Sequence, residues 1–435
     1  MHSLRERPDA RHATRPGSRA HLGHTPTERA IRAAAAVGAP AASRERSGAA
    51  ASAKGAEGAS WHYAKDVSAH LDPGADQRIS RRHVRYAQRE VLWSQSSIER
   101  VRKCGRVPVQ DGGVALKDHQ GVAHYAGVAT CGSIWACPVC SAKIRNHRAE
   151  EISDATARWD RAGHSVYMAT FTAPHDLGMR LDPLMSAIKE AFTSCLSGRA
   201  WIALKKRLGI VGQIRSMEIT HGDHGWHPHL HVLIYVTGDL DASGLADLVT
   251  HLRDRWRTWI TRAGYRPPHD LHGVDVGRCT SAKEAGEYIA KTQDGKAVGN
   301  EITRSDMKTG KGASRTPIEI LDDFRWTGDL QDLALWGEYE RATKGRQAIT
   351  WSKGLRTLLA PDEEEKTNEE IAAEEVGGTE VAIIEGDDWR AITRVPGMTG
   401  HLLDTYEQSG LDGVKAALRR HPRLASIPER LRTGG

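Results

Sequence analysis

Histidines occupy alternate positions at the start of an apolar segment near the centre of the chain. In HPHLHVLIYV (227–236) they are His227, His229 and His231. Successive side chains of a β-strand point to opposite sides of the sheet, so the three imidazoles are predicted to share one face, with Leu230, Val232 and Ile234 on the other. Because a buried imidazole needs a polar partner, three histidines on one face of a strand do not suit an apolar core.

An acidic residue lies in the strand expected just before the histidines. VGQIRSMEIT (211–220) contains Glu218 between apolar Met217 and Ile219. If the two strands form a hairpin, Met217 and Ile219 face the core and Glu218 falls on the histidine face. Two imidazoles can hold a divalent cation with positions left open for substrate oxygens, and Glu218 is the natural third ligand. The alternative is an ordinary exposed carboxylate.

The surrounding segments predict an α+β fold. Residues 164–172, 211–220, 229–236 and 272–277 are predicted to be strands, and residues 182–209, 241–264 and 280–292 to be helices. The order β-α-β-β-α-β-α matches, in its first six elements, a ferredoxin-like (split βαβ) antiparallel sheet with helices packed on one face.

A tyrosine follows in the last of these helices. EAGEYIAK (284–291) places Glu284, Tyr288 and Lys291 on one helical face. A phenol with a pKa near 10 is a weak nucleophile at neutral pH. A cation that polarises a phosphate and an ammonium that favours the phenolate would let Tyr288 attack phosphorus, leaving a 5′-phosphotyrosine and a free 3′-OH. Such spacing is common on amphipathic helices, so this prediction depends on the histidine strand.

Cysteines cluster before the first strand of this sheet. Cys137 and Cys140 form a knuckle-like pair, and Cys131 and Cys104 precede it. Together they predict a structural Zn²⁺ site with four thiolates; scattered free thiols, an iron–sulfur cluster and a redox pair are the alternatives. A basic run follows in KIRNHR (143–148), either as a phosphate-contacting surface or as a solvated helix face.

Charge divides the chain unevenly. The net charge is +6, but residues 361–390 carry −10 and residues 391–435 carry +3, so the first 360 residues carry +13. A basic body suits a polyanionic partner, since phosphate contacts release counterions. The chain has no apolar run near the roughly 18–20 residues that span a bilayer, and no signal sequence. We therefore expect a soluble cytoplasmic protein with no membrane partner.

The composition predicts six regions. They are a disordered basic tail (1–60), a helical, cysteine-rich, zinc-binding region (61–160), a catalytic domain (161–315), a helical extension (316–360), an acidic linker (361–390) and a small helical tail (391–435).

Three ordered motifs in the chain resemble those of the HUH endonucleases. They are FTAPH (171–175), EITHGDHGWHPHLHVL (218–233) and EYIAK (287–291). More closely, the chain resembles the single-tyrosine initiators of rolling-circle plasmid replication found in actinobacterial plasmids. CGSIWACPVCSAKIR (131–145) and LWGEYERATKGRQAITWSKGLR (335–356) also look like that group.

The resemblance implies a site and a function. It implies His229 and His231 as ligands of Mg²⁺ or Mn²⁺, Tyr288 as the nucleophile and, less directly, Glu218 as a ligand and Lys291 as a helper. Glu284 fits the glutamate that some members use to end the cycle, and His227 precedes the ligand pair and would support it without binding the ion. Family members nick one strand at the double-strand origin of a plasmid, and the 3′-OH primes leading-strand synthesis, with a host helicase and a host polymerase as partners.

Other readings of the sequence stay open. A related HUH transposase or relaxase would share the chemistry. H-x-H-x-H followed by apolar residues also matches the histidine-triad nucleotide hydrolases, although Pro228 stands where that motif has an apolar strand residue. A non-catalytic, zinc-containing DNA-binding regulator would bind DNA without cleaving it.

Overall fold

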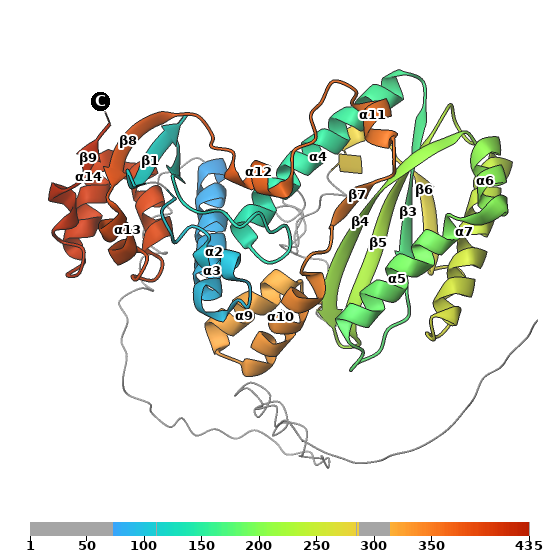
Figure 1. Ribbon diagram of the computed structural model, residues 1–435, viewed down its shortest axis with the longest axis horizontal. Helices are drawn as coiled ribbons and strands as arrows, with labels where there is room; N and C mark the ends of the chain where they lie inside the picture. The colour runs from blue at the N-terminus through green and yellow to red at the C-terminus, as the bar shows by residue number, and fades with distance from the viewer. Residues whose placement is uncertain (1–72, 110, 284, 287–313, 435) are drawn as a thin grey trace, which may run out of the picture. The chain divides into compact units, whose positions relative to one another are not determined.

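The central strand-forming segments assemble into a five-stranded antiparallel sheet. The computed structural model describes residues 73–109, 111–283, 285–286 and 314–434. The strands of the sheet are β3 (Ser165–Thr172), β4 (Ile210–Gly222), β5 (Gly225–Val236), β6 (Val274–Arg278) and β7 (Ile349–Trp351). Their order is β6-β3-β5-β4-β7, and each neighbouring pair is antiparallel (Figure 1). The four predicted strands are confirmed, and β7 joins them from beyond the predicted catalytic region.

Helices α5 (Leu181–Cys195), α6 (Gly198–Arg207) and α7 (Ala242–Arg262) connect these strands, and α5 and α7 lie across one face of the sheet (Figure 1). Leu248, Leu252 and Trp256 recur every fourth residue of α7 and are fully buried against that face. One helix was expected over 182–209. The chain instead forms two, because it turns between Cys195 and Gly198, where glycine adopts a left-handed φ of 85°.

The opposite face of the sheet is also covered. Helix α4 (Pro138–Arg161) and the short helix α11 (Leu355–Leu359) pack Ile152, Trp159 and Leu355 against Leu233 and Tyr235 of β5. The expectation of helices on one face only is therefore wrong. Both covering helices come from sequence that flanks the βαββαβ segment, so the order of its elements gave no sign of them.

A second antiparallel sheet combines distant parts of the chain. It contains β1 (Val114–His119), β2 (Val122–Ala126), β8 (Thr379–Ile384) and β9 (Arg432–Thr433), in the order β2-β1-β8-β9. Helices α13 (Gly386–Ile392) and α14 (Met398–Arg420) contribute Trp389, Leu403 and Leu418 to its buried core. The acidic linker and the helical tail expected from the sequence are therefore parts of one folded sheet-and-helix layer, which also includes strands from the cysteine-rich region.

Further helical segments complete the described part of the fold. They are α2 (Pro73–Gln95), α3 (Glu99–Lys103), α9 (Pro317–Thr327), α10 (Leu330–Thr343), α12 (Asn368–Ala373) and the 3-10 turn η2 (Ile427–Glu429). Buried Arg82 of α2 pairs with Asp404 and Glu407 of α14. Glu90 accepts hydrogen bonds from the Gly397 amide at 2.7 Å and the Thr399 hydroxyl at 2.9 Å, and so caps the start of α14. None of the helices in the described part of the chain is long and apolar enough to cross a bilayer.

Candidate functional site

The histidine strand presents its imidazoles on the face of the sheet that α4 and α11 only partly cover. In the register of the sheet, His229 lies opposite Glu218 of β4, and His231 lies opposite Ser216. The His231 Nε2 and Glu218 Oε2 atoms are 2.9 Å apart. The prediction that Glu218 shares a face with the two histidines is confirmed, while their role as metal ligands stays a prediction.

Two threonines of β3 contact the Nδ1 atoms of these imidazole rings. Thr170 lies opposite His231 and Thr172 opposite His229. Each hydroxyl is 3.3 Å from the Nδ1 atom of its histidine. If each Nδ1 carries the proton and donates it to the threonine oxygen, each Nε2 is left with its lone pair. Neither threonine was predicted as a site residue, although TFT (170–172) alternates in the same way as the histidines.

The donor set suits a hard or borderline divalent cation. Imidazole nitrogen and carboxylate oxygen are ligands that Mn²⁺ accepts, and fixing Nδ1 by a hydrogen bond is a common way to orient a histidine ligand. The rings of His229 and His231 are nearly parallel, at 14°, with centroids 6.1 Å apart. Among the described residues, the four cysteines have ligand atoms that all lie within 4.8 Å of one another. The ligand atoms of His229, His231 and Glu218 are not all that close together.

His227 extends the row of imidazoles. Its ring lies 3.8 Å from that of His229 and 4.0 Å from that of His175, measured between centroids. His175 comes from the FTAPH motif and was not singled out by the sequence. Burial, with smaller contributions from His229 and His175, lowers the pKa of His227 to about 3, so this ring is neutral at physiological pH. A neutral ring supports the ring of His229 without adding charge to the site.

The proposed nucleophile and its helpers, Tyr288, Lys291 and Glu284, lie outside the described residues. The segment that leads to them is described in part: residues 282, 283, 285 and 286 are helical. Ala285 is buried in the same apolar group as Leu233 and Tyr235, which lie two and four positions after His231 on its face of β5. The segment that carries Tyr288 therefore starts on the histidine face.

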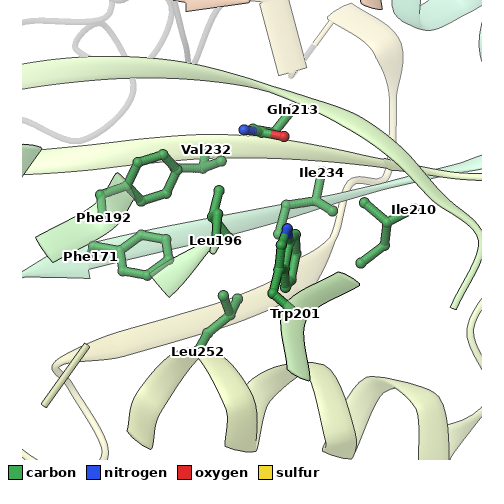
Figure 2. A pocket seen from close by; sticks show the side chains of 9 residues that line it. All are labelled: Phe171, Phe192, Leu196, Trp201, Ile210, Gln213, Val232, Ile234 and Leu252. Carbon is green, nitrogen blue, oxygen red and sulfur yellow. The ribbon is translucent and has the colours of Figure 1, made fainter. Parts of the chain in front are cut away.

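The opposite face of the histidine strand is packed core. Between this face and helices α5, α6 and α7, a cavity of about 10 Å³ is lined by Phe171, Trp201, Val232 and other mostly apolar side chains (Figure 2). Room of this size admits about one water molecule. The candidate functional side chains of the sheet therefore lie on the histidine face.

The four predicted cysteine ligands meet in one buried group. Cys104 Sγ lies 3.7 Å from Cys137 Sγ and 3.6 Å from Cys140 Sγ, and Cys131 belongs to the same group. None of the four forms a disulfide. Hydrogen bonding with Cys104 raises the pKa of Cys131 and Cys137 and lowers that of Cys140. The grouping of the four side chains is confirmed, and zinc stays a prediction.

The basic run after the cysteines is used inside the protein. Lys143 donates to the carbonyls of Ala372 and Glu374. Arg148 donates to Glu151 at 2.8 Å and to the Lys366 carbonyl at 2.6 Å. Lys143 and Arg148 therefore contact the acidic segment, whereas Asn146 of the same run is exposed, and phosphate binding by this run stays a prediction.

Comparison with known proteins gives several relatives. The chain is 34% identical over 349 residues to a Streptomyces lividans protein named "Protein rep", covering 65% of this chain and 76% of that protein. It is 29% identical over 280 residues to the "Neomycin resistance protein" of Streptomyces cyanogenus, covering 53% and 64% of the two chains. A "Protein rep" from Streptococcus pneumoniae is 24% identical over 202 residues, covering 44% and 58%. No family model and no solved structure matches the chain.

Proposed function

Since this chain belongs to the Rep protein family, we propose that it initiates plasmid replication by nicking one DNA strand at an origin. In this proposal the βαββαβ segment, with its strand order β6-β3-β5-β4, is a ferredoxin-like HUH nuclease core. Its DNA partner is the double-strand origin, single-stranded at the nick; a host helicase unwinds the duplex and a host polymerase extends the 3′-OH.

One observation carries this proposal: His229, His231 and Glu218 share a face of the sheet on which the segment leading to Tyr288 begins. The two histidines and Glu218 would hold Mg²⁺ or Mn²⁺, with Thr170 and Thr172 orienting the rings. When bound, such an ion withdraws charge from a phosphate oxygen and so favours nucleophilic attack.

The reaction is a transesterification. Tyr288 loses its proton, a step that the ammonium of Lys291 favours, and its oxygen attacks phosphorus. The bond from phosphorus to the 3′ oxygen breaks, the 3′ oxygen takes up a proton, and the 5′ end stays joined to Tyr288. Glu284 would orient a water or a second DNA hydroxyl when the cycle ends. The phosphotyrosine bond retains the energy needed for religation.

The test uses full-length protein, Mn²⁺ and single-stranded oligonucleotides that cover the origin of its own plasmid. We expect a nick and a covalent protein–DNA adduct, both lost with EDTA and with Tyr288→Phe. Tyr265→Phe is the matched control, since Tyr265 follows α7 and packs half-buried against the apolar core, and this variant should cleave normally.

Other outcomes would contradict the proposal. An adduct on histidine would indicate the histidine-triad chemistry. Binding of the origin without any cleavage would indicate a regulator. Cleavage that requires inverted repeats of a mobile element or a conjugation origin, rather than the plasmid's replication origin, would indicate a transposase or a relaxase.

A further inference from the structure

Arg89 of α2 is buried, and no carboxylate of the described residues forms an ion pair with its guanidinium. Arg89 is 4% exposed, and its Nε and Nη2 atoms have no hydrogen-bond partner among the residues that the structure describes. Its guanidinium lies 4.1 Å from the ring centroid of Tyr86 and 5.6 Å from that of Trp93. Aromatic faces compensate a buried cation only in part, so a guanidinium in this position calls for a nearby negative charge.

The position of Arg89 points to the cysteine group as the source of that charge. A Cβ atom built on Gly105 would lie 2.4 Å from the Arg89 Cζ atom, so the guanidinium lies directly against the backbone next to Cys104. The indole of Trp93, one helical turn after Arg89, donates to the Cys104 carbonyl at 2.8 Å. This face of α2 thus packs on the segment that carries the first of the four thiols.

The separation of the sulfur atoms fits a single ion. Four thiolates at about 2.3 Å from a tetrahedral ion are about 3.8 Å from one another; the Cys104 sulfur lies 3.7 Å from that of Cys137 and 3.6 Å from that of Cys140. A disulfide would bring two sulfurs to about 2.05 Å. In a cubane iron–sulfur cluster each thiolate would bind a different iron, and the sulfurs would stand farther apart.

We propose that the four cysteines bind one thiophilic divalent cation, such as Zn²⁺, as a tetrathiolate whose negative charge is balanced by Arg89. Four thiolates and one divalent ion carry a net charge of −2, and the buried guanidinium offsets half of it. Metal binding therefore stabilises the packing of α2 against the cysteine group. The same helix bonds to the start of α14 through Glu90 and pairs with Asp404 through Arg82. The stabilisation of α2 therefore extends to the helix that packs on the second sheet.

Arg82 provides a matched control. It lies two helical turns before Arg89 and is also buried, but it pairs with the carboxylates of Asp404 and Glu407. Arg89→Met removes the charge next to the thiolates and retains much of the apolar stem, and Arg82→Met makes the same change away from them. Both variants should lose stability, but only the first should lose metal affinity.

The experiment measures Zn²⁺ affinity of the full-length protein by competition with a chromophoric chelator. Co²⁺ serves as a second probe, because its thiolate charge-transfer absorption distinguishes this site from histidine ligands. We expect one thiolate-bound ion per chain. Arg89→Met should weaken Zn²⁺ binding about 10- to 100-fold, as loss of a group that supports metal ligands commonly does. Arg89→Lys should restore most of the affinity, and Arg82→Met should bind as the wild type does.

Hydrogen exchange on the wild-type protein tests the same idea without a variant. Removing the ion with a chelator should lower the protection of the α2 amides while β3 and β5 stay protected. The proposal is overturned if no thiolate-bound ion is found, if Arg89→Met and Arg82→Met bind Zn²⁺ equally well, or if α2 protection does not change on metal removal. None of these outcomes bears on cleavage by Tyr288.

Discussion

Thr170 and Thr172 each place a hydroxyl 3.3 Å from the Nδ1 atom of a proposed metal ligand. Replacing either by valine keeps the shape of the side chain and removes the hydrogen bond to the imidazole Nδ1 atom. We expect Thr170→Val and Thr172→Val to weaken Mn²⁺ binding about 10- to 100-fold, measured from the free-ion signal in electron paramagnetic resonance.

Thr193→Val is the control for this pair, because the Thr193 hydroxyl bonds only to the Lys189 carbonyl within its own helix. It should leave Mn²⁺ affinity unchanged. Equal affinity in all three variants would mean that the threonines do not orient the histidines.

Sequence periodicity was sufficient for some residues of this site and insufficient for others. Alternation along one strand predicted that His229 and His231 share a face. The expected hairpin between the two strands predicted that Glu218 lies on the same face. Thr170 and Thr172 meet the histidines through the register between β3 and β5, which pairs residues about sixty positions apart. Nothing local to either strand determines that register, so the sequence did not identify the threonines.

At the scale of elements, Gly286 controls how the segment leading to Tyr288 approaches α4. A Cβ atom at this position would lie 2.5 Å from the backbone oxygen of Ala149, and backbone cannot move aside as a flexible side chain can. Gly286→Ala should therefore displace the segment by a fraction of an ångström to an ångström. A shift of this size near a nucleophile can lower a rate about 100-fold, measured as the rate of adduct formation.

Gly277→Ala is the corresponding control. Gly277 lies in β6, and a Cβ atom there would meet nothing within 4 Å. This variant should form the adduct at the wild-type rate. An unchanged rate in Gly286→Ala would mean that the close contact with α4 does not position the tyrosine segment.

Glu151 joins α4 to α11 and should make stability depend on pH. Burial alone would raise the pKa of Glu151, but hydrogen bonds from Arg356 and Arg148 outweigh it and lower the pKa. The stabilisation is therefore present above the unfolded-state pKa of about 4.3 and is lost as the pH falls through the lower folded-state value. Glu151→Gln should lower the free energy of unfolding by about 1–3 kcal/mol near neutral pH.

This difference between Glu151→Gln and the wild type should shrink as the pH falls from about 5 toward 3 in urea unfolding. Glu150→Gln tests the exposed neighbouring carboxylate and should change the free energy of unfolding by less than about 0.5 kcal/mol. A difference for Glu151→Gln that stays constant with pH would contradict an ionised Glu151 in the fold.

At the scale of the whole molecule, the second sheet shows what the sequence could not predict. β1 pairs with β8, so Val114 lies opposite Ile384 although 270 positions separate them. The many acidic residues of 361–390 indicated a solvated linker, because composition carries no information about partners. In the structure, Arg158 and Arg100 pair with Glu363 and Glu369, so acids and bases far apart in the sequence neutralise one another.

This neutralisation changes the expected DNA-binding surface. Lys143 belongs to the basic run, but its ammonium is held by the carbonyls of Ala372 and Glu374. Each phosphate contact that is lost should reduce the slope of log K against log salt by about 0.9 for duplex DNA and about 0.7 for a single strand. Lys143→Met should leave that slope unchanged in fluorescence anisotropy with an origin oligonucleotide. A slope that falls by a full contact would mean that DNA displaces the acidic segment and binds α4 directly.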